Sequence, residues 1–159
     1  MIAPATAADL PDLARLMAAS ALLRRYRMEG ESAALQSLTT AFDNGDLLLL
    51  TREHGVTGLA WATFAPRALD GAAYLRLLLV AEAARNAGTG ARLLTAVEDR
   101  ARARANHLYL LVTTDNAAAR RFYERHGYRH IGDLPALVWP DLDEALYHKG
   151  LRPYGERIR

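Results

Sequence analysis

The chain of 159 residues contains no cysteine, which excludes disulfide bonds, thiol chemistry and any metal site built from thiolates. It also lacks an apolar run near the roughly 18 residues that a membrane helix needs. Its start, Met1-Ile2-Ala3-Pro4, has no charged segment followed by a long apolar one, as a signal peptide would. These absences predict a cytoplasmic protein with no membrane partner.

Lysine is almost missing, since Lys149 is the only one, and the net charge is just +2. A nucleic-acid-binding protein usually shows a concentrated basic stripe. Here the arginines are spread over several predicted helices, so we expect solvated helix faces and no nucleic-acid partner. These arginines are Arg24, Arg25, Arg27, Arg100, Arg102, Arg104, Arg120, Arg121 and Arg125.

The composition, with 51% hydrophobic and 24% charged residues, is typical of a soluble globular protein. The length predicts a single domain over residues 1–159. Strand patterns occur at residues 2–5, 47–51, 56–64, 74–80, 108–112, 128–131 and 145–151. Helical patterns occur from Thr6 or Asp9 to about Leu23, at 32–42, after residue 90, and from Asn116 to His126. A loop with Pro135, Trp139 and Pro140 separates the last two strands, and the order predicts a mixed sheet flanked by helices.

A glycine-rich loop, residues 85–90, lies between an apolar strand and a helix in which Leu94, Val97 and Ala101 recur at helical spacing. The first amides of a helix have no partner within it, and the helix dipole adds partial positive charge there. Such a site favours phosphate, and Arg85 contributes a cation at its edge. The loop therefore predicts a pyrophosphate site that consists of Arg85, Asn86, Ala87, Gly88, Thr89 and Gly90.

The same glycines also fit a simple tight connection between strand and helix. No Lys-Ser or Lys-Thr follows the loop, which excludes a Walker-type phosphate loop, and the third glycine of a dinucleotide fingerprint is missing after Gly90.

A second motif runs from Asn116 to Tyr128, with the sequence NAAARRFYERHGY. Each of its residues has a structural interpretation: Asn116 is a favoured helix cap, Phe122 fits the core side, and Gly127 ends a helix. Tyr123 could be a packed aromatic residue with its hydroxyl at the surface. The presence of this motif together with the glycine-rich loop favours a functional role for Tyr123 over a purely structural one.

Together, Arg85-x-x-Gly88-x-Gly90 and the Asn116–Tyr128 motif resemble the GNAT superfamily of acyl-CoA-dependent N-acetyltransferases, over essentially the whole chain. The resemblance implies an α/β fold, α+β in stricter schemes. In this GNAT-like acyl-CoA N-acyltransferase fold, a mixed, mostly antiparallel sheet of about seven strands is flanked by about four helices.

The resemblance also implies a transferase reaction in which an amine attacks the thioester of acetyl-CoA directly, with no metal. Backbone amides near Leu79 and Val80 would hold the pantetheine and polarise the carbonyl. Asn116 would face the pantetheine arm, and Tyr123 would be the catalytic residue that gives a proton to the departing sulfur of coenzyme A.

One departure from the family concerns the general base. Many members carry a glutamate or aspartate on the strand before the loop, where this chain has Tyr74 and no carboxylate. A water relay remains an alternative, as does a side chain from another loop, such as Glu29, Glu31 or Asp70.

The acceptor is expected to be a primary amine of a small molecule or peptide. In the family it is bound by segments that correspond to residues 24–31 and 135–144. A homodimer is an open alternative to a monomer. A non-catalytic acyl-CoA-binding or regulatory module is the alternative function.

Overall fold

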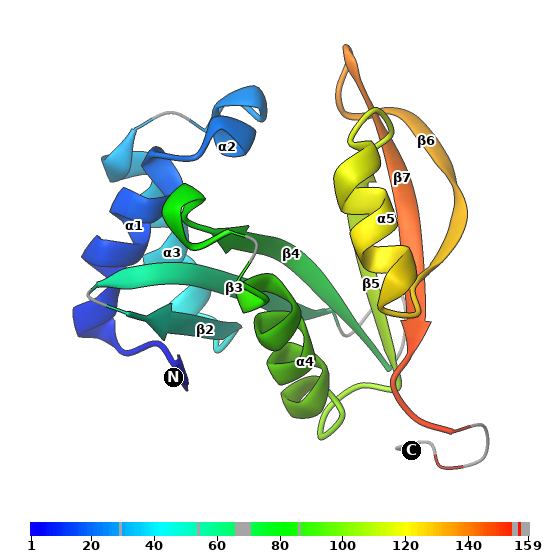
Figure 1. Cartoon of the computed structure of the whole chain (residues 1–159), viewed down its shortest axis with the longest axis horizontal. Coiled ribbons are helices and arrows are strands. Elements are labelled where there is room, and N and C mark those ends of the chain that lie inside the picture. Colours follow the sequence, from blue (N-terminus) through cyan, green and yellow to red (C-terminus); the bar gives the residue numbers. More distant parts are fainter. Residues whose placement is uncertain (29, 54, 66–70, 86, 154–155, 157–159) are drawn as a thin grey trace. The chain divides into compact units, whose positions relative to one another are not determined.

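The computed structural model describes residues 1–28, 30–53, 55–65, 71–85, 87–153 and 156 (Figure 1). Seven strands form one sheet in the order β1-β2-β3-β4-β5-β7-β6. The registers described are antiparallel except for the parallel pair β4–β5. Five α-helices lie within the described ranges. The predicted fold class is therefore confirmed, with one helix more than expected.

The chain divides into two compact units, which are described separately below. Unit 1 comprises residues 1–62 and 77–97, and unit 2 comprises residues 63–76 and 98–159. Strands β3 (Val56–Ala65) and β4 (Ala72–Val80) and helix α4 (Thr89–Ala101) contribute residues to both. No helix in the described ranges has both the length and the apolar character needed to cross a membrane.

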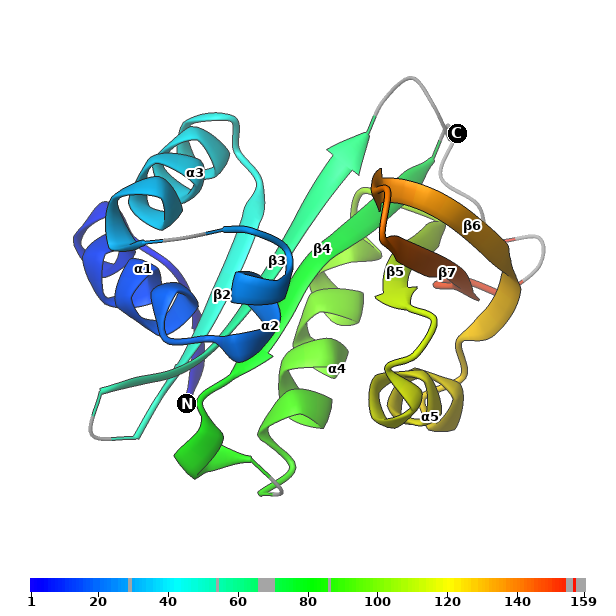
Figure 2. The same cartoon turned by 90° about the horizontal axis from the view of Figure 1, so that it is seen from above.

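Unit 1 is built on β1 (Ile2–Pro4), β2 (Leu47–Arg52) and the paired part of β3. Helices α1 (Leu10–Ala18) and α3 (Glu31–Asp43) cover one face of β2 and β3 (Figure 2). Apolar side chains from these helices and strands form a continuous core, which includes Leu13, Met17, Leu38, Leu50, Leu59 and Leu79.

Helix α4 approaches the other face of unit 1 very closely at Gly58 of β3. A Cβ atom on Gly58 would lie 2.8 Å from Cδ1 of Leu93 and 3.2 Å from the carbonyl oxygen of Leu79. Only glycine leaves room for this contact, and the contact sets how near the first turns of α4 lie to the strands.

The helix expected to run to about Leu23 is interrupted. Helix α1 ends at Ala18, and a separate helix, α2 (Ala21–Arg25), follows. Ser20 takes an extended conformation, and its hydroxyl accepts the N–H of Leu23 at 3.3 Å. Serine is a favoured helix cap because its side chain replaces a missing backbone partner, so it starts a new helix here.

Unit 2 contains β5 (His107–Thr113), β6 (Arg129–Trp139), β7 (Leu142–Gly150) and helix α5 (Ala117–Arg125). Strand β7 lies between β5 and β6 and is antiparallel to both. The Tyr147 hydroxyl of β7 donates to Glu124 at 2.8 Å and accepts from Arg120 at 3.0 Å. Because both partners belong to α5, this helix covers the face of the sheet that carries Tyr147.

The predicted loop between the last two strands is mostly strand. Strand β6 continues through Pro135 to Trp139, and β7 already begins at Leu142. Pro135 is tolerated because β6 is the edge strand of the sheet, where a missing N–H costs no ladder bond. The register shifts between Leu134 and Trp139, and Ala136 has a positive φ of 51°, as expected of a bulge.

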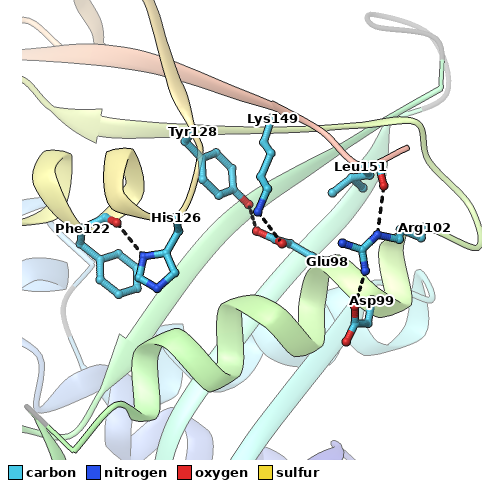
Figure 3. A network of polar contacts seen from close by, with 8 residues as sticks. All are labelled: Glu98, Asp99, Arg102, Phe122, His126, Tyr128, Lys149 and Leu151. Atoms are coloured by element: carbon cyan, nitrogen blue, oxygen red, sulfur yellow. Dashed lines mark hydrogen bonds and ion pairs between the residues drawn. The ribbon is translucent and has the colours of Figure 1, made fainter. Parts of the chain in front are cut away.

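A buried polar cluster joins the end of α4 to β7 within unit 2 (Figure 3). Glu98 is 5% exposed. Its Oε1 accepts the Tyr128 hydroxyl at 3.0 Å, and its Oε2 lies 2.7 Å from Nζ of Lys149. Nearby, Nε of Arg102 donates to the carbonyl of Leu151 at 3.0 Å. Both oxygens of the buried carboxylate are therefore satisfied, as stability requires.

Candidate functional site

The glycine-rich loop in unit 1 connects β4 to α4 through a short 3-10 turn, Glu82–Ala84. The chain reverses at Gly88, whose φ is +72° and around which a Cβ would meet nothing within 4 Å. Its carbonyl accepts the N–H of Arg92 at 3.0 Å, so the helical ladder reaches back to Gly88. The N–H groups of Thr89, Gly90 and Ala91 consequently have no partner inside the helix.

Two arginines lie at this helix start. Arg85 is exposed at the end of the 3-10 turn. The guanidinium of Arg92 donates to the carbonyl of Ala87 at 3.3 Å and to the Thr89 hydroxyl at 3.1 Å. The positive charge of Arg92 is thus fixed beside the amides, and the helix dipole adds to it. This combination suits a phosphate group.

Arg92 was not among the predicted site residues, although its position in the sequence could have indicated that it lies beside the loop. It lies four residues after Gly88, which places it one helical turn from the loop. The loop carbonyl of Ala87 and the hydroxyl of Thr89 then hold it there.

The other predicted cofactor residues of unit 1 lie on the same segment of chain. Leu79 is buried in the core and Val80 is half-buried at the end of β4. Ala87 and Gly88 are exposed, Thr89 is buried and Gly90 is half-buried. Asn86 lies outside the described residues.

Asn116 caps helix α5 in unit 2, as one interpretation of the sequence predicted. Its Oδ1 accepts the N–H of Ala119 at 3.1 Å. This hydrogen bond fixes the start of the helix that carries Tyr123 and leaves the Asn116 amide nitrogen as a potential donor.

Tyr123 lies near the end of α5 among other aromatic rings. Its ring meets Phe122 at 5.2 Å and Tyr128 at 5.6 Å, both edge to face. Phe122, which was expected in the core, is only half-buried and contacts the His126 ring at 4.4 Å (Figure 3). Gly127 follows with a φ of +85°, so it ends the helix in the predicted left-handed conformation.

The electrostatic surroundings of Tyr123 keep its hydroxyl protonated. Burial raises the pKa of Tyr123 above its ordinary value, and the neighbouring Tyr74 raises it further. Within the described part of the chain the hydroxyl makes no hydrogen bond, so it can donate its proton to a bound molecule. A protonated tyrosine at neutral pH is suited to act as a general acid.

Of the three carboxylates named as alternatives for the general base, one lies within the described residues. Glu31 is exposed at the start of α3 in unit 1, where it lies 3.7 Å from Arg15. Glu29 and Asp70 lie outside the described residues. The described residues also contain no group of three or more histidines and carboxylates placed to hold a metal ion.

Tyr74, at the strand position where many family members have a carboxylate, is half-buried in unit 2. Burial raises the pKa of Tyr74, Arg76 lowers it, and the charge of Glu144 raises it. Glu144 was named from the sequence only as the end of the expected acceptor-binding segment, residues 135–144. It is fully buried on β7, and the signal was a carboxylate between apolar residues of a strand, Leu142, Ala145 and Leu146.

Comparison with curated protein sequences gives no match, but many solved structures are similar. A ribosomal-protein-alanine N-acetyltransferase from Brucella melitensis is 23% identical, with a TM-score of 0.78 over 94% of this chain and 99% of that chain. An aminoglycoside 6'-N-acetyltransferase complexed with coenzyme A is 17% identical, with a TM-score of 0.77 over 96% and 98% of the two chains.

A third similar structure, a proposed acetyltransferase from Salmonella typhimurium with its cofactor acetyl-CoA, is 19% identical. Its TM-score is 0.79, over 99% of this chain and 97% of that chain. At these identities the three likenesses show a shared fold. Residues 16–128, most of the sequence, match the family described as acetyltransferase (GNAT). The chain belongs to the GNAT acetyltransferase family.

Proposed function

We propose that this protein is an N-acetyltransferase which transfers the acetyl group of acetyl-CoA directly to a primary amine of a small molecule or peptide. The observation that carries the proposal is the start of α4, where Gly88 leaves amides without helical partners and Arg92 supplies a fixed cation. Membership of an acetyltransferase family supports it. A single catalytic domain over residues 1–159 and a cytoplasmic location remain predictions.

The proposal assigns the pyrophosphate of acetyl-CoA to the loop of unit 1, residues 85–90. Thr89, Gly90 and Ala91 provide backbone donors there, and Arg85 and Arg92 provide positive charge. The backbone of Leu79 and Val80 is assigned to the pantetheine and to the carbonyl of the acetyl group. Asn116 of unit 2 is assigned to the pantetheine arm, through its amide nitrogen.

In the proposed reaction, acetyl-CoA supplies the activated acetyl group as a thioester. The acceptor nitrogen bonds to the carbonyl carbon and the carbon–sulfur bond breaks. Tyr123 gives its hydroxyl proton to the departing sulfur, so that coenzyme A leaves as the neutral thiol. The acylated nitrogen releases its extra proton to solvent, and the Tyr123 hydroxyl regains a proton from solvent, so an amine and a thioester become an amide and a thiol. The raised pKa of Tyr123 ensures that this proton is present at neutral pH.

A non-catalytic acyl-CoA-binding or regulatory module is the second candidate. One observation favours it: strand β4 carries no carboxylate to deprotonate an incoming ammonium. This module would bind acetyl-CoA through the same loop but would not accelerate thioester cleavage by any amine.

Thermal unfolding with and without acetyl-CoA tests the cofactor assignment. At a hundredfold excess over Kd, binding stabilises the folded state by about 2.7 kcal/mol, which corresponds to roughly 5–10 °C in Tm. Gly88→Val should abolish this increase, because its φ of +72° is strained for valine and the loop must change shape.

Gly45 provides a matched control, because it has the same φ of +72° with nothing within 4 Å, at the end of α3. Gly45→Val should carry the same backbone strain and keep the full acetyl-CoA effect. If folded Gly88→Val keeps it as well, the loop does not bind the cofactor.

Thioester cleavage over a panel of alkylamines, arylamines and peptides then separates the two candidate functions. An N-acetyltransferase releases coenzyme A faster with at least one of these amines and forms the corresponding amide. Cofactor binding without acceleration by any amine would favour the non-catalytic module.

A further inference from the structure

Two histidines of unit 2 contact each other across neighbouring strands. His107 is the first residue of β5, and His148 lies near the end of β7. Nδ1 of His107 and Nε2 of His148 are 3.1 Å apart, and the centroids of the two rings are 5.2 Å apart. The facing nitrogens are therefore at hydrogen-bond distance, and the side chains join the two strands directly.

The strand register explains why these two rings meet. His107 is paired with Gly150, which has no side chain, and Tyr109 is paired with His148. His107 and His148 are thus diagonal neighbours on one face of the sheet, a separation that long side chains can span. The contact consequently follows from the antiparallel pairing of β5 with β7.

Tyr109 shields the pair from one side. The centroid of its ring lies 4.7 Å from that of His148 and 6.5 Å from that of His107. All three residues are half-buried. Partial removal from water disfavours the charged form of an imidazole and strengthens a hydrogen bond between neutral rings.

The contact limits the number of protons that the two rings can hold. A neutral imidazole has one N–H group and one acceptor nitrogen. Of the two facing nitrogens, one must carry a hydrogen and the other must be bare to accept it. One extra proton can bind at the far nitrogen of the donor ring without breaking the contact. A second extra proton places an N–H group on both facing nitrogens, so the hydrogen bond is lost and two positive rings face each other.

The neighbouring strands present few charged or titratable groups to this pair. On β6, the exposed Arg129 is paired with His148. On β4, the half-buried Tyr74 is paired with Tyr109, and tyrosines are neutral at the pH where histidine titrates. Glu144 lies on the same face of β7 but four positions from His148, about 13 Å along the strand. The nearest charge that these strand pairings provide is therefore positive.

These surroundings disfavour a positive charge on His148. Burial, and then the charges of His107 and Arg129, lower the pKa of His148. In the unfolded chain the same imidazole takes up a proton near its ordinary pKa of about 6.5. Just below that pH the unfolded state binds more protons than the folded state, so the stability of the fold decreases as the pH falls.

We propose that the contact between His107 and His148 is a pH-sensitive switch in the sheet of unit 2. It joins β5 to β7 while at most one extra proton is bound, and it separates when a second extra proton binds. Acidification then replaces a hydrogen bond between the strands with repulsion between two imidazolium rings. The inference is independent of the proposed acetyl transfer, because neither histidine is assigned to acetyl-CoA or to the acceptor.

NMR titration of the imidazole nitrogens tests the proton count. In the parent, we expect one of the two rings to titrate well below pH 6.5, since the protonation states of contacting rings are coupled. In His107→Gln the neighbouring charge is absent, and the glutamine oxygen can accept from a protonated His148. The titration of His148 should then move up toward its ordinary range.

Urea unfolding at about pH 7.5 and about pH 5 tests the consequence for stability. The urea midpoint of the parent should fall between the two conditions. In His107→Gln or His148→Gln the fall should be smaller by about 0.5 M, which corresponds to roughly one hydrogen bond. If one variant does not fold, the other provides the comparison.

His126→Gln is the matched control. It removes a histidine of the same unit whose Nδ1 donates to the carbonyl of Phe122, so it should leave the titration of His148 unchanged and should not reduce the fall in the urea midpoint. Independent titration of His107 and His148 near pH 6.5 in the parent would overturn the switch. The same fall in the parent, His107→Gln and His148→Gln would overturn it as well.

Discussion

The groups proposed to bind acetyl-CoA in unit 1 differ in kind from the groups proposed to react in unit 2. In unit 1, the loop before α4 presents backbone amides and arginines near the surface. In unit 2, the groups of interest are buried or half-buried side chains, such as Tyr123, Glu98 and Glu144. A site made of several amides loses little when one side chain changes, whereas a buried polar group depends on each partner. Substitutions that change a side chain and leave the backbone in place should therefore have larger effects in unit 2.

The largest effect is expected for Lys149→Met. The change leaves the Glu98 carboxylate buried, and among the described residues the Tyr128 hydroxyl is then its one remaining side-chain partner. We expect a loss of about 3 kcal/mol in the free energy of unfolding, the lower end of the range for breaking a buried ion pair, since Lys149 is 25% exposed. Urea unfolding measures it.

A double variant sharpens this first test. Combining Glu98→Gln with Lys149→Met removes both charges and keeps an oxygen to accept from Tyr128, so most of the lost stability should return. Equal losses in the single and double variants would show that the contact of Lys149 with its surroundings, rather than the buried charge, stabilises unit 2.

The next largest effect is expected for Tyr123→Phe. This change removes the hydroxyl and keeps the ring between Phe122 and Tyr128. We expect an unchanged Tm and acetyl-CoA affinity, with kcat lowered by about tenfold to a thousandfold. The loss should shrink when a more acidic thiol replaces coenzyme A as the leaving group, because that thiolate needs less stabilisation.

Tyr128→Phe is the control for this variant. It removes a neighbouring hydroxyl that donates to Glu98, so it should lower stability and leave the chemical step unchanged. Parent-like turnover by Tyr123→Phe, with chemistry shown to be rate-limiting, would make Tyr123 a packing residue.

The smallest effect is expected in unit 1, for Arg92→Ala. Its guanidinium lies beside the loop, but its side chain is 56% exposed, and water and salt weaken such charges. We expect the Kd for acetyl-CoA to rise by less than about tenfold and its salt dependence to become shallower. Arg15→Ala, with a side chain that is 61% exposed on α1, should change neither quantity. A loss as large as that of Gly88→Val would contradict the division of binding among several amides.

Local chemistry accounts for what could be predicted from the sequence. The positive φ of Gly88 and the capping by Asn116 depend on a few neighbouring residues, so they could be inferred before the fold was known. The break at Ser20 was missed because serine is also tolerated inside helices, and only its hydrogen bond to Leu23 shows the new start.

Long-range pairing accounts for what could not be predicted. Pro135 was interpreted as a loop residue, because the sequence does not reveal that β6 is an edge strand. The burial of Glu144 was missed for a similar reason: it was placed at the end of an acceptor-binding loop, and only the strand order shows that it belongs to β7, between β5 and β6.

The ion pair between Lys149 and Glu98 has a practical consequence for an enzyme that would modify amines. Lys149 is the only lysine in the sequence, and its amino group is engaged by a buried carboxylate. No other side chain of this chain carries a primary amine that could compete for the acetyl group. In assays that follow acetyl label into protein, self-labelling at lysine should therefore be minimal, so label recovered in an added peptide reports on that peptide.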